Sequence, residues 1–274
     1  MELGDIFDRA AGRMPMVPKV VQELIASFDR ANTDVDSIAD KVSHDQVLSA
    51  KVLRLANSAR MSGGRAVRSI EDAVVLLGFD NLRMLVVASG VSSMSAPNPG
   101  FDRQAFWRRS FQVATAARCV ARYARIDANT AYTVGLLHNI GELLIHVAFP
   151  TESVKIDRLV DTGADRIQVE NMVIGLDLTQ VGEELAKRWH FPEEIQRAIR
   201  QHKNPTAFPQ FEPLAGVVAL ADLLVTEFVK GIDDAGVIDT LPANLLDKLG
   251  VSAELLGPDL EKIREQCMAV DDLL

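Results

Sequence analysis

The sequence has few aromatic residues and no long apolar run. Aromatic residues make up 5% of its 274 residues, although hydrophobic residues as a group make up 48%. A core built mainly from Leu, Val, Ile, Ala and Met favours packed helices, because β-sandwiches depend more on aromatic side chains. No apolar stretch approaches the roughly 20 residues that a membrane-spanning helix needs. The N-terminus also lacks the basic and apolar segments of a signal peptide.

Cysteine and positive charge are scarce as well. Cys119 and Cys267 are the two cysteines, and their wide separation predicts neither a disulfide framework nor a metal site. The formal net charge is -9, from 29 basic and 38 acidic residues. This balance argues against broad nucleic-acid binding, which requires a basic surface. Together these features favour a cytoplasmic protein.

Helical periodicity runs through the whole chain, and no segment is convincing as a strand. Ser69 with Asp72 is a typical start of a helix, and Gly78 is a typical end. In the second half, one long helix is expected over residues 102–125 and another, uninterrupted, over residues 129–148. The other helices are expected at 20–28, 33–42, 47–55, 80–91, 152–161, 165–174, 179–189, 192–202, 214–228, 242–249 and 253–268.

Pro97, Asn98, Pro99 and Gly100 form the clearest interruption of this pattern. We therefore expect an all-α protein in three parts. Residues 1–95 would form an N-terminal helical subdomain, residues 100–230 a helical bundle, and residues 231–274 acidic C-terminal helices.

The pair His138-Asn139 lies within the apolar stretch predicted as the second long helix. A His followed by Asp in such a helix is a metal-ligand pair in many helical phosphohydrolases. Neutral imidazoles and carboxylates suit divalent ions, and the bound ion lowers the pKa of a water molecule that then attacks phosphorus. Asn139 carries no charge, so the pattern indicates an altered form of this chemistry.

Several motifs in a consistent order extend this likeness. The chain resembles the HDOD family, the HD-related output domains of bacterial signalling proteins, over about 180 residues. The resemblance implies an HD-like multi-helix bundle. The matching segments are Leu48–Ala59, Val67–Gly78, Phe106–Ser110, Gly135–Gly141, Val181–Trp189, Phe191-Pro192 and Ala219–Asp222.

The resemblance also identifies the altered positions of the HD site. Arg109 stands where the first His ligand is expected, the pair is His138-Asn139, and Asp222 is the last carboxylate. Active phosphodiesterase relatives tend to read His-Asp-Ile-Gly-Lys, whereas this chain has Glu142 at the position of the Lys. His202 is a further candidate pocket residue.

These changes oppose metal binding. A unit positive charge 4 Å from a divalent ion costs about 8 kcal/mol at an effective dielectric near 20. One imidazole and one carboxylate would remain, fewer than the three protein ligands typical of catalytic zinc sites. We therefore predict no catalytic residue, no metal and no cofactor. We also predict an ion pair between Arg109 and Asp222 in place of the metal, with His138 and Asn139 hydrogen-bonded nearby.

His146 follows His138 by eight residues on the same predicted helix. We expect a hydrogen-bonded core histidine, with a pocket-lining residue as the alternative.

The resulting hypothesis is a non-catalytic regulatory module that contacts a signalling protein, such as a kinase, a response regulator or a cyclic-dinucleotide enzyme. Membrane and nucleic-acid partners are not expected. Two alternatives stay open: a metal-dependent phosphohydrolase of a nucleotide or cyclic dinucleotide, and a nucleotide sensor without turnover.

Overall fold

A computed structural model describes residues 3–10, 35–43, 49, 52–53, 56, 67, 69–78, 82, 100–189 and 191–270. These residues are helical or lie in turns and loops between helices, and none of them forms a strand, so the predicted all-α class is confirmed. No helix in this described part is both long enough and apolar enough to cross a bilayer.

The chain divides into two compact units, one of residues 12–95 with Leu273 and one of residues 1–11 and 96–272 with Leu274. Helix α1 (Leu3–Ala10) therefore belongs with the second half of the chain, whereas residues 1–95 were expected to form one subdomain. The C-terminal helices belong to the same unit as residues 100–230. The predicted three-part division stays a prediction.

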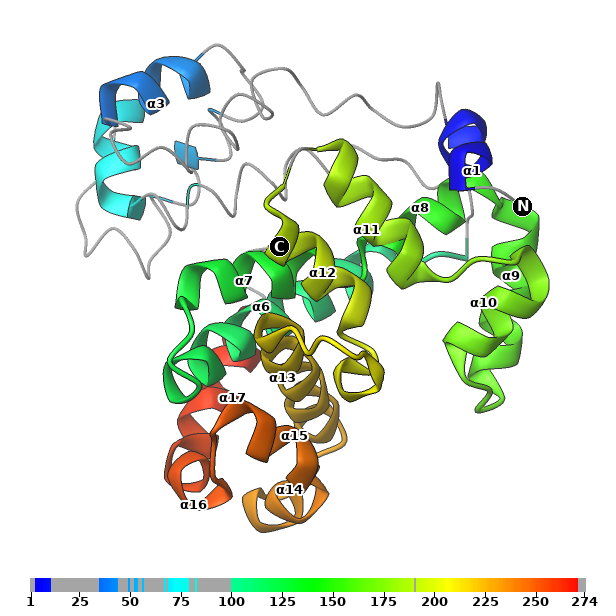
Figure 1. The fold of residues 1–274 in the computed structure, drawn as a ribbon. Helices are drawn as coiled ribbons and strands as arrows, with labels where there is room; N and C mark the ends of the chain where they lie inside the picture. The colour runs from blue at the N-terminus through cyan, green and yellow to red at the C-terminus, as the bar shows by residue number, and fades with distance from the viewer. Residues whose placement is uncertain are drawn as a thin grey trace. The chain divides into compact units, whose positions relative to one another are not determined.

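In the unit of residues 12–95, the longer described helical segments are α3 (Val35–Ser43) and residues 70–78, and residues 49, 52–53, 56 and 82 are helical as well (Figure 1). The predicted start of the second segment is confirmed, because the amide of Asp72 donates to Ser69 Oγ at 3.0 Å. Gly78 ends it with a φ of +70°, a conformation that glycine adopts without strain. The expected helices at 20–28, 47–55 and 80–91 lie wholly or largely outside the described residues.

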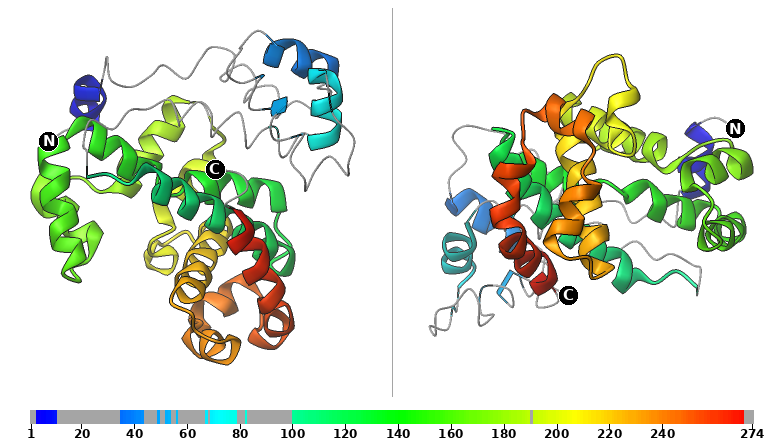
Figure 2. Two further views of the ribbon diagram at one scale, coloured as in Figure 1. Left: turned by 180° about the vertical axis from the view of Figure 1, so that it is seen from behind. Right: turned by 90° about the horizontal axis from the view of Figure 1, so that it is seen from below.

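In the other unit, α6, α7 and α13 pack against one another at the centre, and α11 and α12 lie beside them (Figures 1 and 2). Helix α1 packs on α8 and α11, and the C-terminal helices pack on α13 and α6. The bounds are α1 (Leu3–Ala10), α6 (Arg103–Tyr123), α7 (Ala128–Leu137), α8 (Ile140–Ala148), α9 (Pro150–Asp161), α10 (Arg166–Ile174), α11 (Leu178–Arg188), α12 (Glu193–Gln201), α13 (Pro213–Val229), α14 (Asp234–Thr240), α15 (Ala243–Leu249), α16 (Ala253–Leu256) and α17 (Leu260–Met268), with short 3-10 turns at Pro205–Ala207 and Gly257–Asp259.

Small residues set the distance between α6 and α7. A Cβ atom on Gly135 would lie 2.7 Å from the Cα atom of Ala114, so the two backbones touch where each helix presents a small residue. Asp102 begins α6 by accepting a hydrogen bond from the amide of Ala105 at 2.9 Å. The close approach of Gly135 to Ala114 places Arg109 of α6 beside the end of α7.

Two predicted helices are interrupted. The expected helix over 253–268 is split by a 3-10 turn at Gly257–Asp259, because Pro258 cannot donate a backbone hydrogen bond within a helix. The expected helix over 129–148 ends at Leu137 and begins again at Ile140. This second break bears directly on the candidate site.

Candidate functional site

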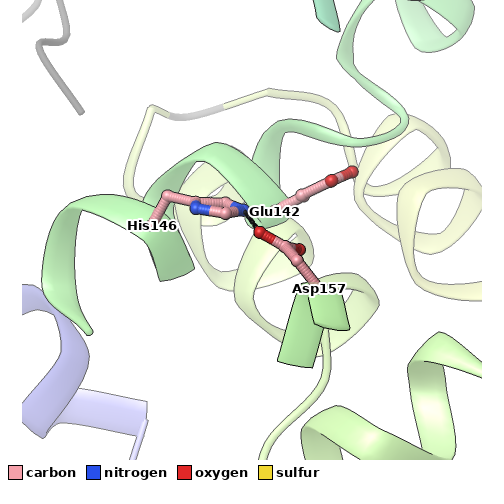
Figure 3. Close-up of side chains that lie close together, drawn as sticks. All are labelled: Glu142, His146 and Asp157. Carbon is pink, nitrogen blue, oxygen red and sulfur yellow. Dashed lines mark ion pairs between the residues drawn. The ribbon is translucent and has the colours of Figure 1, made fainter. Parts of the chain in front are cut away.

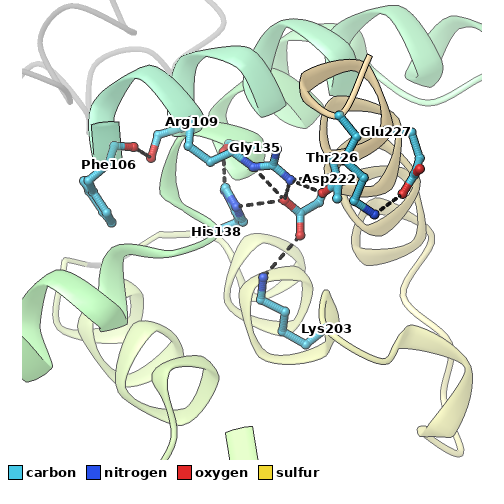
Figure 4. Close-up of polar contacts among 10 residues, drawn as sticks. Phe106, Arg109, Gly135, His138, Lys203, Asp222, Thr226 and Glu227 are labelled. Atoms are coloured by element: carbon cyan, nitrogen blue, oxygen red, sulfur yellow. Dashed lines mark hydrogen bonds and ion pairs between the residues drawn. The ribbon is translucent and has the colours of Figure 1, made fainter. Parts of the chain in front are cut away.

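Two clusters of charged side chains lie in the unit that contains α6 to α17. One surrounds Glu142 (Figure 3) and the other surrounds Asp222 (Figure 4). The break between α7 and α8 connects the two clusters. Its residue His138 lies beside Asp222, and its residue Asn139 lines the same pockets as Glu142.

The prediction of one uninterrupted helix over 129–148 is wrong, and a close contact with α11 lies directly after the break. A Cβ atom on Gly141 would lie 1.9 Å from the carbonyl oxygen of Leu178, so α8 begins in backbone contact with α11. Asn139 has φ -102° and ψ 13°, outside the helical values, and the amide of Glu142 bonds back to its carbonyl at 2.9 Å. The sequence offered no Pro or C-cap Gly at this point to predict the break.

Arg109 of α6 and Asp222 of α13 form the predicted ion pair. Arg109 Nη2 lies 2.6 Å from Asp222 Oδ1, and Nε donates to the same oxygen at 3.2 Å. Nη2 also donates to the backbone carbonyl of Asp222 at 2.7 Å and to Thr226 Oγ1 at 2.5 Å. The guanidinium is thereby tied to two successive turns of α13, and the prediction of this pair is confirmed.

A second cation approaches the same carboxylate from the end of α12. Lys203 Nζ lies 3.2 Å from Asp222 Oδ2, while the neutral His138 Nε2 lies 3.8 Å from Oδ1 (Figure 4). Burial alone would raise the pKa of Asp222, but the charges of Lys203 and the neighbouring groups outweigh it and hold the pKa well below its usual range. Asp222 is therefore ionised at neutral pH between two cations.

His138 and His202 are buried next to each other, with ring centroids 5.3 Å apart and ring planes at 89°. Nδ1 of His138 lies 2.6 Å from the carbonyl oxygen of Gly135, and Nδ1 of His202 lies 2.8 Å from that of Ile199. A neutral imidazole must donate from Nδ1 in these contacts, which leaves Nε2 as an acceptor.

Both rings are neutral at pH 7. Burial lowers the pKa of His138 to about 4 and lowers the pKa of His202 well below its usual value. Within the described part of the chain, neither Nε2 atom has a hydrogen-bond partner, and neither does Oδ1 of Asn139. The expected hydrogen bond of His138 is present through Nδ1, whereas that of Asn139 is not seen among these residues.

The metal that an HD-type site would hold does not fit the residues around Asp222. His138 Nε2 and Asp222 could each donate a lone pair, but Arg109 already occupies the carboxylate and Lys203 adds a second positive charge. Asn139 supplies no charge. The donors present, His138 Nε2, His202 Nε2 and Asp222, lie beside two cations, whose positive charges oppose a divalent ion.

Glu142 lies in the other cluster, with residues that the sequence did not indicate as its neighbours. His146 follows it by one turn on α8, Asp157 comes from α9, and Arg166 and Glu170 come from α10. Arg166 Nη2 lies 2.8 Å from Asp157 Oδ1 and 3.5 Å from Glu142 Oε1, and Nη1 lies 3.4 Å from Glu170 Oε1. One guanidinium thus balances three carboxylates.

Burial governs the protonation of this second cluster. Burial raises the pKa of Glu142, although Arg166 opposes the change, and raises the pKa of Glu170 to about 7. Burial also lowers the pKa of His146 to about 4 against the charge of Asp157. His146 is therefore a neutral, buried ring, and its Nδ1 atom has no hydrogen-bond partner among the described residues, contrary to the hydrogen-bonded core histidine that we expected.

Two pockets lie at these clusters, and Asn139, Glu142 and Arg166 line both of them. The smaller, of about 330 Å³, is also lined by Phe101, Arg109, His146, Asp157 and Asp161. The larger, of about 700 Å³, is also lined by Asp165, Asp177, Thr179, Arg200, Lys203 and Phe208. The predicted site residues are therefore divided: Arg109, Asn139 and Glu142 border the smaller pocket, whereas His138 and His202 are buried.

Lys203, Asp157 and Arg166 were not predicted from the sequence. Lys203 directly follows His202, so its position beside a candidate pocket residue was an available signal. Asp157 and Arg166 lie in ordinary amphipathic helices, and nothing in their spacing indicates that they converge on Glu142.

Comparison with known proteins agrees with the fold and the order of these elements. A model of the HDOD domain matches residues 14–205. A solved structure of a putative phosphohydrolase from Shewanella amazonensis SB2B is 33% identical, covers 98% of each chain and superposes with a TM-score of 0.82. A solved HDOD domain protein from Geobacter sulfurreducens is 28% identical over 99% of this chain and 98% of its own, with a TM-score of 0.80.

Two further relatives are longer than this chain. A solved putative signal transduction protein from Marinobacter aquaeolei VT8 is 25% identical with a TM-score of 0.80, and the match covers 95% of this chain and 59% of that one. An uncharacterized protein from Treponema pallidum (strain Nichols) is 24% identical over 245 residues, so this chain spans about half (47%) of its length. Because the family model covers well over half of the sequence, the protein belongs to the HDOD family.

Proposed function

We propose that this HDOD protein is a non-catalytic module of bacterial signal transduction that acts through protein–protein contacts. The observation that carries the proposal is the Arg109–Asp222 ion pair, with Nη2 and Oδ1 2.6 Å apart. Asp222 stands at the last carboxylate position of an HD-type site, and the cation of Arg109 neutralises it. Lys203 adds a second positive charge to the same carboxylate. A fold that keeps the helices of the family without the HD-type metal ligands can still serve as a docking scaffold.

Under this proposal the partner is a signalling protein such as a kinase, a response regulator or a cyclic-dinucleotide enzyme, and the module works in the cytoplasm. One solved relative is named a putative signal transduction protein, which supports a role in signalling. The two buried, free thiols of Cys119 and Cys267 are in keeping with a reducing compartment.

Phosphodiesterase assays with a reconstructed site test the absence of catalysis. The wild-type chain, supplied with Mn²⁺ or Zn²⁺, should not hydrolyse a cyclic dinucleotide or bis(p-nitrophenyl) phosphate above the buffer rate. The double variant Arg109→His and Asn139→Asp restores the implied ligand set, and metal binding that depends on His138 should appear in it. Turnover by the wild-type chain that His138→Ala abolishes would overturn the proposal.

A second function, sensing of a small nucleotide without turnover, is favoured by the larger pocket. Its volume of about 700 Å³ lies within the range of small-molecule sites, and Arg200, Lys203 and Phe208 border it. A nucleotide that binds only the folded chain would raise its midpoint of thermal unfolding. This function requires that Arg200→Ala abolish the rise, while Arg197→Ala on the same helix, which does not border the pocket, should leave it unchanged.

A further inference from the structure

The cluster around Glu142 differs from the Asp222 cluster in its balance of charge. At Asp222, two cations, Arg109 and Lys203, face one carboxylate. On the other side of Asn139, the single guanidinium of Arg166 faces the carboxylates of Glu142, Asp157 and Glu170. Asp161 and Arg109 border the same pocket. The cations at Asp222 repel a metal ion, whereas the carboxylates around Arg166 outnumber the cations that contact them and so attract one.

Three side chains in the second cluster also have the chemistry and proximity of metal ligands. A carboxylate oxygen of Glu142, a ring nitrogen of His146 and a carboxylate oxygen of Asp157 all lie within 4.8 Å of one another (Figure 3). Glu142 and His146 are four residues apart on α8 and so share a face of that helix. Asp157 approaches from α9, and Nε2 of His146 lies 3.5 Å from its Oδ2 atom.

Arg166 is a competing cation at these ligand atoms. Its Nη2 atom lies 3.5 Å from Oε1 of Glu142 and donates to Oδ1 of Asp157, which leaves Oδ2 of Asp157 facing the imidazole. The His146 side chain is only 1% exposed, and its Nδ1 atom has no hydrogen-bond partner among the described residues, while Nε2 lies 3.5 Å from Oδ2 of Asp157. A buried neutral imidazole beside two carboxylates would gain a partner from a cation placed among them.

We propose that Glu142, His146 and Asp157 bind a divalent transition-metal ion in the smaller pocket. Ligands of one such ion lie about 2.0 to 2.2 Å from it and hence roughly 3 to 4 Å from one another, so small side-chain rotations bring the three into place. Mixed nitrogen and oxygen donors suit Mn²⁺ and Zn²⁺, while the imidazole disfavours Mg²⁺ and Ca²⁺.

Arg166 has a defined part in this proposal. It neutralises the carboxylates of Glu142 and Asp157 when no ion is bound, and it keeps its contact with Glu170, which is fully buried, when the ion enters. The ion would then join α8 and α9 directly, beside the start of α10. The site is independent of the proposed regulatory function, because it shares no ligand with the Asp222 cluster.

Isothermal titration calorimetry on the full chain, freed of metal with a chelator, tests the site with Mn²⁺ and Zn²⁺ as probes. We expect one ion per chain, and about a tenfold or greater loss of affinity in His146→Ala and in the near-isosteric Glu142→Gln. Arg166→Gln should change affinity in the opposite direction, because it removes the competing cation. Nitrogen coupling from a bound imidazole should appear in pulsed electron paramagnetic resonance of the Mn²⁺ complex and disappear in His146→Ala.

The matched controls are His138→Ala and Asp222→Asn, which alter the other cluster and should bind metal like the wild type. Absence of binding to folded wild-type protein would overturn the proposal, as would full affinity in Glu142→Gln. Loss of binding in the control variants with retention in His146→Ala would instead assign the metal to the Asp222 cluster, and so would contradict both this inference and the proposed function. Circular dichroism of each variant establishes that it is folded.

Discussion

The guanidinium of Arg109 contacts the side chain of Asp222, its backbone carbonyl and the hydroxyl of Thr226 one turn further along α13. A metal ion in the same place would be released by a chelator, whereas this cation is part of the chain. The ion pair therefore links α6 to α13 permanently, and it gives a separable contribution to stability.

A double-mutant cycle measures that contribution. Both side chains are partly exposed, 28% for Arg109 and 22% for Asp222, so we expect a coupling energy of about 1 to 2 kcal/mol between Arg109→Ala and Asp222→Ala in chemical unfolding. Lys230→Ala, which removes an ion pair with Glu227 whose lysine is 58% exposed, should change stability by less than about 0.5 kcal/mol. A coupling energy no larger than that control effect would contradict the structural role of Arg109.

Acid should destabilise the protein through His138. The folded-state pKa is about 4 and the usual value is 6.5, so the unfolded chain binds more protons between these two pH values. Stability from this group is therefore present above pH 6.5 and is lost as the pH falls toward 4. From about pH 7 to about pH 4 the wild type should lose up to about 3 kcal/mol more than His138→Asn.

The comparison with His138→Asn is needed because other groups titrate in the same range. The raised pKa of Glu170, about 7 against a usual 4.5, makes its contribution to stability increase as the pH falls between these values, opposite to that of His138. The difference between the two proteins removes this opposing effect. Urea unfolding of both proteins at several pH values measures the difference in their free energies of unfolding. If this difference does not change with pH, His138 is not held neutral by the fold.

Gly141 should tolerate no side chain. A Cβ atom at this position would lie 1.9 Å from the carbonyl oxygen of Leu178, which is backbone and cannot rotate away. Gly141→Ala should cost more than about 3 kcal/mol or prevent folding, since α8 and α11 would have to separate. Gly4→Ala in α1, where nothing lies within 4 Å, should be neutral or slightly stabilising in the same thermal unfolding measurement.

Asp177 should contribute more to stability than an exposed helix cap. It begins α11, its side chain is 7% exposed, and it accepts hydrogen bonds from the amides of Thr179 and Gln180. It also accepts from Asn171 at 3.1 Å. Asp177→Ala should cost about 2 to 3 kcal/mol, against about 1 kcal/mol for Asp165→Ala at the exposed start of α10. Equal losses in denaturant titrations would refute this ranking.

Local chemistry made several elements predictable. Ser69 and Gly78 limit a helix through contacts within a few residues, and the structure has both as expected. The pairing of Arg109 with Asp222 was also predictable, because the family resemblance placed both at positions that converge on one point. The role of that pair in regulation remains a prediction.

Other features depend on packing between distant segments. The break after Leu137 arises where Gly141 meets the carbonyl of Leu178 on α11, and no residue near 138 indicates it. Lys203 reaches Asp222 only because α12 and α13 pack together.

The all-helical class, the HDOD family and the pairing of Arg109 with Asp222 could therefore be predicted from the amino-acid sequence. These rest on hydrophobic periodicity and on residue types at matched positions. Only the packing of the folded helices brings Glu142 into a cluster with His146, Asp157 and Arg166. The physical reason is that charge balance at a point depends on every ionised group that the packed helices bring there, and α8, α9 and α10 converge only in the folded chain.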